Sequence, residues 1–337
     1  MSIRVRFSQI HMGVRVTITC HAPDQDVAER ASTAAFARFA ELDQVMSDYR
    51  PSSELMRLCA MAGQGPVKIS RDLFVVLRRS QEVAYLSCGA LDVTCGPLVR
   101  LWREARERRV LPDAETIREA RGRCGYRSLV LKEGIQHGVG LVAGSSGDDP
   151  LRSAELQLPE MLLDLGGIGK GYACDEALSV LRAHGVGSAL VEAGGDIAVS
   201  GPPPETEGWR VLVQGDDATP SAVPEFLAKD AEDAQSPQRQ GPLKAPLLQK
   251  DGTGTLVLAN CAVSTSGDFE QHLDIDGVRH SHVIDPRTGL ALTDGVQVTV
   301  IASDALTSDS LTKVCGVLGP EGSTAILLHF NAKAIYK

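Results

Sequence analysis

Hydrophobic residues near the N-terminus recur at helical spacing. In "APDQDVAERASTAAFARFAELDQVMSDYR", Ala35, Phe39, Leu42 and Met46 are separated by four, three and four positions, which places them on one face of an amphipathic helix. The preceding segment, "MSIRVRFSQIHMGVRVTITC", spreads arginines among its apolar residues. That pattern predicts a strand and not a secretory signal. We therefore expect a cytoplasmic protein, or one on the periplasmic side of the inner membrane if a leader has been removed.

Four further segments have the pattern of helices. "ISRDLFVVLRRSQEVAYLSCG" has Ser70 as a suitable N-cap and ends at Gly89, and another helix is expected around Trp102. "KGYACDEALSVLRAHG" predicts a helix that ends at Gly185. Near the end of the chain, "TSDSLTKVCGVLG" (residues 307–319) predicts one more. No segment approaches the length needed to span a membrane.

Short β-rich segments separated by Gly, Asp or Ser fill much of the remaining chain. They are "GALDV", "YRSLVLKEG", "GVGLVAG", "AELQLPE", "MLLDLGG", two strands around the Gly-Gly of "VGSALVEAGGDIAVSG", "TLVLANCAVSTSG", "VRHSHVIDPRTG" and "GVQVTVIAS". Residues 216–254 combine Pro, Gln, Asp and Lys with little periodicity, so we expect a surface insertion there. The chain is expected to fold as a mixture of α and β elements.

Charge and cysteine content narrow the class of partner. The net charge is −9 and the chain has no run of Lys and Arg, which argues against a nucleic-acid surface. A small molecule or a protein is the more suitable partner. The eight cysteines form no CxxC pair, so neither a zinc knuckle nor a thioredoxin-like motif is available. They are expected to be reduced thiols.

The segment "LDLGGIGKGYACDEA" places several glycines and Lys170 immediately before a helix. Backbone N–H groups at a helix start bind anions, and the lysine adds a positive charge. The spacing matches neither the P-loop nor the GxGxxG fingerprint. Glycines in such a segment more often serve tight turns and close packing than a phosphate site, so the residues alone favour the packing interpretation.

Two histidines in "HSHVIDPRTG" lie on the same side of a predicted strand, because side chains alternate across a sheet. His280 or His282 could serve as a general base, since imidazole titrates near neutrality. The alternative is that each is an ordinary hydrogen-bonded residue before the turn that begins at Asp285 and Pro286. The pattern favours this alternative for His280 and leaves both interpretations open for His282.

Asp309 and Lys313 are four positions apart in the helix predicted at 307–319. As an exposed pair they would stabilise the helix by only ~0.3–0.5 kcal/mol. Asp309 could instead be an oxygen ligand for Mg²⁺, an ion that prefers carboxylates together with substrate phosphates. The spacing does not decide between the two.

Eight segments, in chain order, together resemble the ApbE family of FAD:protein FMN transferases. These are "MGVRVTI", "MSDYRPSSELMRL", "GALDVTCGPLVRLW", "LDLGGIGKGYACDEA", "VEAGGDIAVSG", "AVSTSGDFE", "HVIDPRTG" and "SDSLTKVCGVLG". The resemblance runs from about residue 7 to 330, apart from the insertion. It implies a single α+β domain over residues 1–337, related to the T-fold, with mixed antiparallel sheets, packed helices and two lobes around FAD.

The resemblance also implies an activity. Family members use Mg²⁺ to split the FAD pyrophosphate, move FMN onto a Thr or Ser hydroxyl of an acceptor redox protein and release AMP. Some relatives hydrolyse FAD instead, so an FAD pyrophosphatase and a non-catalytic flavin-binding paralogue remain alternatives. Association with a membrane is expected only through the acceptor.

Site residues are carried over from the resemblance position by position. It implies that the Gly169 carbonyl and Asp309 hold the metal, that the Gly166–Gly171 loop lies beside the phosphates and that His282 is the base. The residues expected to contact FAD are Met12, Tyr49, Ala90, Leu91, Asp92, Gly166, Lys170, Tyr172 and Val283.

Two features depart from the family pattern. The family helix has a Thr ligand four positions after the aspartate, where this chain has Lys313, and a protonated lysine has no lone pair to give a metal. The ammonium could replace part of the metal's charge, the metal could bind with fewer ligands, or the protein could bind flavin without transferring it. At the other departure, "NAKAIYK" ends in a predicted strand that relatives continue into a hairpin, which suggests a truncated or diverged terminus.

Overall fold

The computed structural model describes residues 2–134, 151–212, 247–248, 255–267 and 272–337. Its largest sheet has seven strands in the order β1-β2-β6-β7-β11-β16-β17, and every neighbouring pair is antiparallel. The strands are β1 (Ile3–His11), β2 (Val14–Ala22), β6 (Ser188–Ala193), β7 (Asp196–Val199), β11 (Cys261–Ser266), β16 (Val298–Ala302) and β17 (Lys333–Tyr336). The strand expected in "NAKAIYK" is β17. The predicted α+β class with antiparallel sheets is confirmed, while the division into two lobes stays a prediction.

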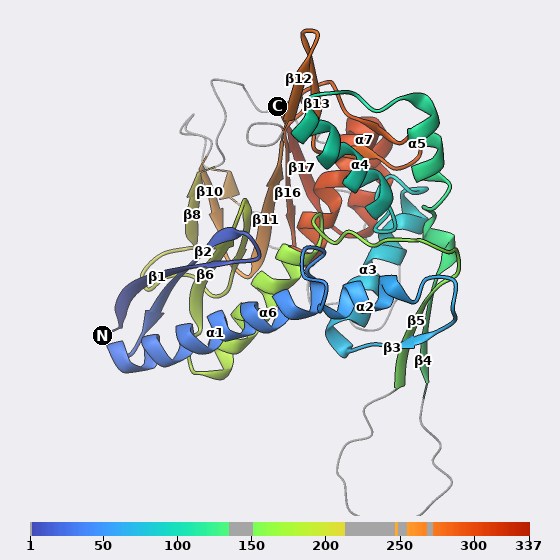
Figure 1. Ribbon diagram of the computed structural model, residues 1–337. Helices are drawn as coiled ribbons and strands as arrows, with labels where there is room; N and C mark the ends of the chain where they lie inside the picture. Colours follow the sequence, from blue (N-terminus) through green and yellow to red (C-terminus); the bar gives the residue numbers. More distant parts are fainter. Residues whose placement is uncertain (1, 135–150, 213–246, 249–254, 268–271) are drawn as a thin grey trace, which may run out of the picture.

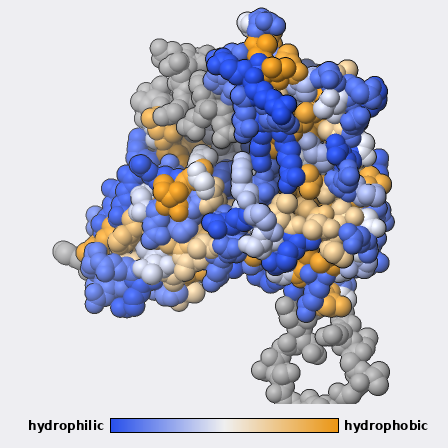
Figure 2. Space-filling model, in the orientation of Figure 1, coloured by the Kyte–Doolittle hydropathy of each residue, from blue (hydrophilic) through white to orange (hydrophobic). Residues whose placement is uncertain are grey.

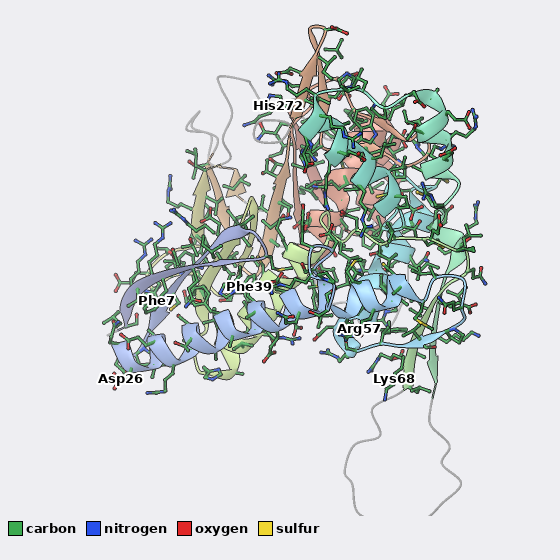
Figure 3. All side chains as sticks on the ribbon, viewed as in Figure 1. Phe7, Asp26, Phe39, Arg57, Lys68 and His272 are labelled. Carbon is green, nitrogen blue, oxygen red and sulfur yellow. The ribbon has the colours of Figure 1, made fainter. Side chains whose placement is uncertain are left out.

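Three helices pack on this sheet and on one another: α1 (Gln25–Met46), α6 (Gly169–Ala183) and α7 (Ala305–His329). Figure 1 shows α1 running beneath β1, β2 and β6, with α6 beside it. The helical spacing predicted for α1 is confirmed, because its predicted apolar face is buried. Figure 3 shows Phe39 between α1 and the sheet, where it is fully buried in the main core.

The remaining helices lie around and below α7, in the right half of Figure 1. They are α2 (Glu54–Ala60), α3 (Arg71–Leu86), α4 (Gly96–Arg108), α5 (Ala114–Arg121) and the short 3₁₀ turn η1 (Tyr126–Ser128). The predicted cap of α3 is confirmed, since Ser70 Oγ accepts the N–H of Leu73 at 3.2 Å. Gly185 has φ 83° just after α6, the left-handed conformation predicted for the end of that helix.

Smaller sheets surround this framework. One consists of β3 (Val67–Lys68), β5 (Leu151–Leu156) and β4 (Leu129–Gly134), and another of β8 (Trp209–Leu212), β10 (Thr255–Leu258) and β9 (Leu247–Leu248). Two hairpins follow, β12 (His272–Ile275) with β13 (Val278–Ser281) and β14 (Ile284–Asp285) with β15 (Leu290–Ala291). Strand β9 falls inside the predicted insertion 216–254, whose other residues lie outside the described ones, as does the strand expected in "GVGLVAG".

Two predicted strands are absent. "GALDV" and "MLLDLGG" form no strand: the N–H of Asp164 donates to the carbonyl oxygen of Val93 at 2.8 Å, and an isolated parallel bridge links Cys95 with Leu162. The cause in the first segment is Asp92, whose carboxylate accepts the backbone N–H and the hydroxyl of Thr94. A carboxylate that bonds two residues ahead folds the backbone into a turn and competes with a strand. The prediction of strands at these two places was wrong.

Helix α7 extends beyond the predicted range on both sides. It begins after Asp304, whose side chain accepts the N–H of Thr307 at 2.8 Å, and it is kinked at Gly319 (φ 69°), immediately before Pro320. A proline inside a helix removes one hydrogen bond, and glycine tolerates the left-handed angle. Asp309 therefore lies in the second turn, where α7 passes α6.

No helix in the described part of the chain is long and apolar enough to cross a membrane. Hydrophilic residues cover most of the face shown in Figure 2, and the apolar residues on it form small separate groups. This surface offers no broad apolar area for a lipid or protein partner on that face.

Candidate active site

The glycine segment and the predicted C-terminal helix meet at the start of α6. Gly171 donates its backbone N–H to Oδ2 of Asp309, at 3.2 Å. A Cβ at Gly171 would collide with the carbonyl oxygen of Ala305 and press on Cβ of Asp309. The absence of a side chain at position 171 thus lets α7 approach α6 and brings Asp309, which is buried, to the first turn of α6.

Lys170 joins two buried carboxylates. Its Nζ lies 3.2 Å from Oδ2 of Asp196 and 3.8 Å from Oδ2 of Asp309, and it donates to the carbonyl oxygen of Gly166 at 3.1 Å. Burial opposes the charged form of this lysine, but the two carboxylates outweigh burial and raise its pKa. Lys170 is therefore a fixed positive charge at the glycine segment, as the anion-site interpretation requires.

The sequence analysis did not identify Asp196. It is the first residue of β7 and is 3% exposed. Burial and the nearby Asp309 raise its pKa to about 6, while Lys170 and Lys313 oppose that shift. Its Oδ2 accepts no hydrogen bond among the described residues, although the Lys170 ammonium is close. An acidic residue that opens the apolar stretch "DIAV" directly after Gly-Gly was the available sequence signal.

Lys313 is not an exposed partner of Asp309. Its Nζ donates to Oγ of Ser266 at 2.9 Å and to Oγ1 of Thr312 at 3.2 Å, and it lies 4.0 Å from Oδ1 of Asp309. The aliphatic part of the side chain packs on Gly167, where an added Cβ would lie 3.0 Å from Cγ of Lys313. Burial lowers the pKa of Lys313, and Asp309 opposes that shift. The lysine therefore points along the glycine segment.

Arg103 on α4 connects the glycine segment to Tyr49. Its Nη1 donates to Oδ2 of Asp48, and its Nη2 donates to Oδ2 of Asp164 at 2.8 Å. The other oxygen of Asp164 accepts the N–H of Gly166 at 2.9 Å. The guanidinium carbon lies 4.6 Å from the centre of the Tyr49 ring, a cation–π distance. Tyr49 itself is 75% exposed, consistent with a surface that can take a ligand.

The two histidines have different surroundings. The His280 ring stacks on Trp102 with centroids 5.7 Å apart, which agrees with the structural role favoured for it. His282 follows β13 and is half-buried. The next residue, Val283, lines a small cavity against β11 and α7, together with Ser266, Ser281, Leu292, Asp294, Val296, Val298, Thr312 and Gly316. The segment that carries His282 therefore lies close to Ser266, which binds Lys313.

The sequence profile of the ApbE family matches residues 12–336. The chain belongs to the ApbE family. The FAD:protein FMN transferase of Treponema pallidum is 32% identical over 317 residues, which cover 94% of this chain and 78% of the relative. The FAD:protein FMN transferase of Escherichia coli K12 is 30% identical over 288 residues, 85% of this chain and 70% of the relative.

Solved ApbE structures share the fold. The apo form of the Pseudomonas stutzeri flavinyl transferase ApbE matches with a TM-score of 0.74 and 26% identity, covering 99% of this chain and 91% of that one. The flavin transferase ApbE of Vibrio cholerae matches with a TM-score of 0.75 and 26% identity, covering 100% and 96%. The resemblance found in the sequence is thereby confirmed over nearly the whole chain.

Met12 lies next to the start of α6, and its predicted contact with FAD stays a prediction. It occupies the turn between β1 and β2 with φ 49°. A Cβ at Gly169 would lie 3.9 Å from Cε of Met12 and 3.7 Å from Sδ of Met46, so Met12 contacts the first residue of α6. A groove of about 220 Å³ opens at the same turn, lined by Ile10, His11, Met12, Gly13, Ala40, Asp43, Gln44 and Arg50.

Other residues assigned to FAD are buried beside the glycine segment, where Asp164 donates its N–H to the carbonyl oxygen of Val93 at 2.8 Å. Ala90, Leu91 and Asp92 are buried, and the Asp92 carboxylate is already used by Thr94 and by the N–H of Tyr126. Tyr172 is also buried, and its hydroxyl donates to Oδ1 of Asp72 on α3 at 2.7 Å. The side chains of Asp92 and Tyr172 make hydrogen bonds within the protein, and the contact of these residues with FAD stays a prediction.

The ApbE family implies a magnesium ion, but the residues present here do not suit one. No group of three or more His, Cys, Asp or Glu side chains in the described ranges could hold a metal. The predicted ligand Asp309 is flanked by Lys170 and Lys313. An ammonium about 4 Å from a divalent ion costs roughly 8 kcal/mol at an effective dielectric constant of about 20. With Gly169 offering only its carbonyl, these residues do not fit a protein-held Mg²⁺.

Proposed function

We propose that this protein transfers FMN from FAD to a Thr or Ser hydroxyl of an acceptor redox protein and releases AMP. The observation that carries the proposal is the convergence of the Lys170 and Lys313 ammonium groups on the glycine segment at the start of α6. Two positive charges and a helix N-terminus form a site for a dianionic pyrophosphate. The curated relatives named FAD:protein FMN transferases support the same activity.

The transfer needs one bond to form and one to break. The acceptor oxygen attacks the phosphorus of the FMN half of FAD and forms a new O–P bond, while the bond from that phosphorus to the bridging oxygen breaks. AMP leaves with the electron pair, and the hydroxyl proton passes to His282, which acts as general base. Positive charge fixed in advance lowers the barrier, because negative charge grows on the pyrophosphate oxygens during transfer.

One aromatic ring of FAD and the pyrophosphate occupy separate places in this proposal. The flavin or adenine ring would lie near Tyr49 and the Met12 groove, while the pyrophosphate reaches Lys170. Arg103 would hold Tyr49 and the Gly166 backbone in a fixed relation, since it contacts both regions. Association with a membrane would occur only through the acceptor.

The test is an intact-mass measurement. The protein is incubated with FAD, Mg²⁺ and an acceptor domain that carries one flavinylation threonine, and a Thr→Val acceptor serves as the matched control. The proposal predicts that the threonine acceptor gains the mass of one FMN with equimolar AMP, and that the valine acceptor gains nothing. AMP and free FMN without a mass gain would show an FAD pyrophosphatase, and intact FAD would show a flavin-binding protein.

A further inference from the structure

The charged side chains at the start of α6 balance one another without a metal ion. Asp196 and Asp309 face Lys170 and Lys313, and the nearest oxygen-to-nitrogen distances between them run from 3.2 to 4.0 Å. All four carboxylate and ammonium groups are largely removed from solvent. A divalent ion bound at Asp309 would lie beside the ammonium groups of Lys170 and Lys313 in a low-dielectric site, and the repulsion between these positive charges is costly.

We infer that the ammonium groups of Lys313 and Lys170 together supply the positive charge at the FAD pyrophosphate, so that flavin transfer here requires no divalent metal ion. The inference rests on the proposed function. Two lysines carry the same charge as one divalent ion, and lysine binds phosphate as a point charge. This explains why the residues around Asp309 do not suit the Mg²⁺ that the ApbE family implies: the two lysines already supply its charge.

The ammonium group of Lys313 is held in a position from which it can bind a phosphate oxygen. Ser266 on β11 and Thr312 on α7 each accept one of its protons, and Gly167 packs against its aliphatic part. An ammonium has three protons, so one remains for Asp309 or for a phosphate oxygen. Because the side chain lies along Gly167, that proton is placed beside the backbone segment expected to contact the phosphates.

Lys170 contributes from the opposite side of Asp309. Its ammonium is bound to Asp196 and to the Gly166 carbonyl, and it lies 3.8 Å from Oδ2 of Asp309. Asp309 therefore separates two ammonium groups that would otherwise repel each other. In this arrangement its role is to position the two lysines, whereas a metal ligand would need a free face toward the ion.

The experiment measures transfer by the full-length protein with FAD and the threonine acceptor, either in EDTA or with Mg²⁺. The wild type should keep its rate within about twofold in EDTA. Lys313→Met should lose roughly 100-fold under both conditions. Lys313→Thr restores a hydroxyl oxygen as a metal ligand, so it should be slow in EDTA and faster with Mg²⁺. The exposed Lys68 (Figure 3) provides the control Lys68→Met, which should behave as the wild type.

A binding measurement in EDTA separates the role of Lys313 from catalysis. Lys313→Met should weaken FAD binding by about tenfold and leave riboflavin binding unchanged, because riboflavin has no pyrophosphate. Loss of wild-type transfer in EDTA with recovery in Mg²⁺ would overturn the inference and leave the proposed function standing. If no acceptor is modified under any condition, the proposed function fails. If Lys313→Met weakens the binding of FAD and of riboflavin by the same factor, this inference is overturned, whatever the transfer assay shows.

Discussion

Gly171 and Ala305 touch through their backbones, with the Gly171 Cα packed against the Ala305 carbonyl oxygen so closely that no side chain fits between them. This contact sets the distance between α6 and α7. It also brings the N–H of Gly171 within hydrogen-bonding range of Asp309. The geometry of the charged site therefore depends on a residue that has no functional group.

Gly171→Ala should destabilise the fold, since the added methyl group forces the two helices apart. We expect the free energy of unfolding to fall by about 3 kcal/mol, at the upper end of overpacking effects. Urea unfolding followed by circular dichroism measures the change. Gly187→Ala is the matched control, because a Cβ there meets nothing within 4 Å. Equal stability of the two variants would contradict the close contact.

His282→Gln tests the proposed base. Transfer should fall by about 10²–10⁴-fold, the usual contribution of general base catalysis, while FAD affinity stays the same. Single-turnover transfer and fluorescence titration with FAD give the two quantities. His280→Gln is the paired control, because that ring stacks on Trp102; it should reduce stability and leave the transfer rate of the folded protein unchanged. A His282→Gln variant with normal transfer would exclude this residue as the base.

The sequence predicted the elements that depend on local pattern. The buried face of α1 and the Ser70 cap of α3 were correctly placed, because helical spacing and capping act within a few residues. Asp309 and Lys170 were identified from their own segments. The distant partners of these residues were not predicted: Asp196 and Arg103 gain their roles only when strands and helices far apart in the chain meet.

The wrong strand assignments have a related cause. "GALDV" and "MLLDLGG" contain the apolar residues of a strand, and those residues are largely buried. Burial is achieved instead by turns that hydrogen bonds to Asp92 and Asp164 hold in place. A short apolar run does not reveal whether its backbone pairs with a strand or folds around a side chain. Tertiary contacts determine that these two segments form turns and not strands.

Arg103→Lys should weaken FAD binding. Lysine keeps the charge but cannot contact Asp48 and Asp164 at once with a planar fork, and it covers Tyr49 less well. We expect roughly a tenfold increase in the Kd for FAD. Titration by flavin fluorescence measures it, with Arg108→Lys on the exposed side of α4 as control. If the two variants bind FAD equally, Arg103 does not organise the site.

Stability should depend on pH through Asp175. Burial and the nearby Asp304 raise the pKa of Asp175 from 3.8 to about 7, although the carboxylate accepts the N–H groups of Ala305 and Leu306. The folded form thus binds more protons than the unfolded form between these values. Its contribution to stability is therefore present below about pH 4 and is lost as the pH rises to about 7.

Asp175→Asn removes this titration. Relative to the wild type, the variant should gain about 4 kcal/mol of stability as the pH rises from about 4 to about 8. Urea unfolding at the two pH values gives the difference, and the exposed Asp26→Asn should show no such change. A stability difference between wild type and Asp175→Asn that is the same at both pH values would contradict the assignment.

In the proposed reaction FMN passes directly from FAD to a protein hydroxyl. The most direct test is to run the reaction in water labelled with a heavy oxygen isotope. Mass spectrometry of the products shows where the label goes. In direct transfer the bridging oxygen leaves with AMP and the acceptor oxygen binds the phosphorus. We therefore predict an acceptor carrying FMN on its threonine, unlabelled AMP and no free FMN. Labelled FMN or labelled AMP, with an unmodified acceptor, would contradict the account.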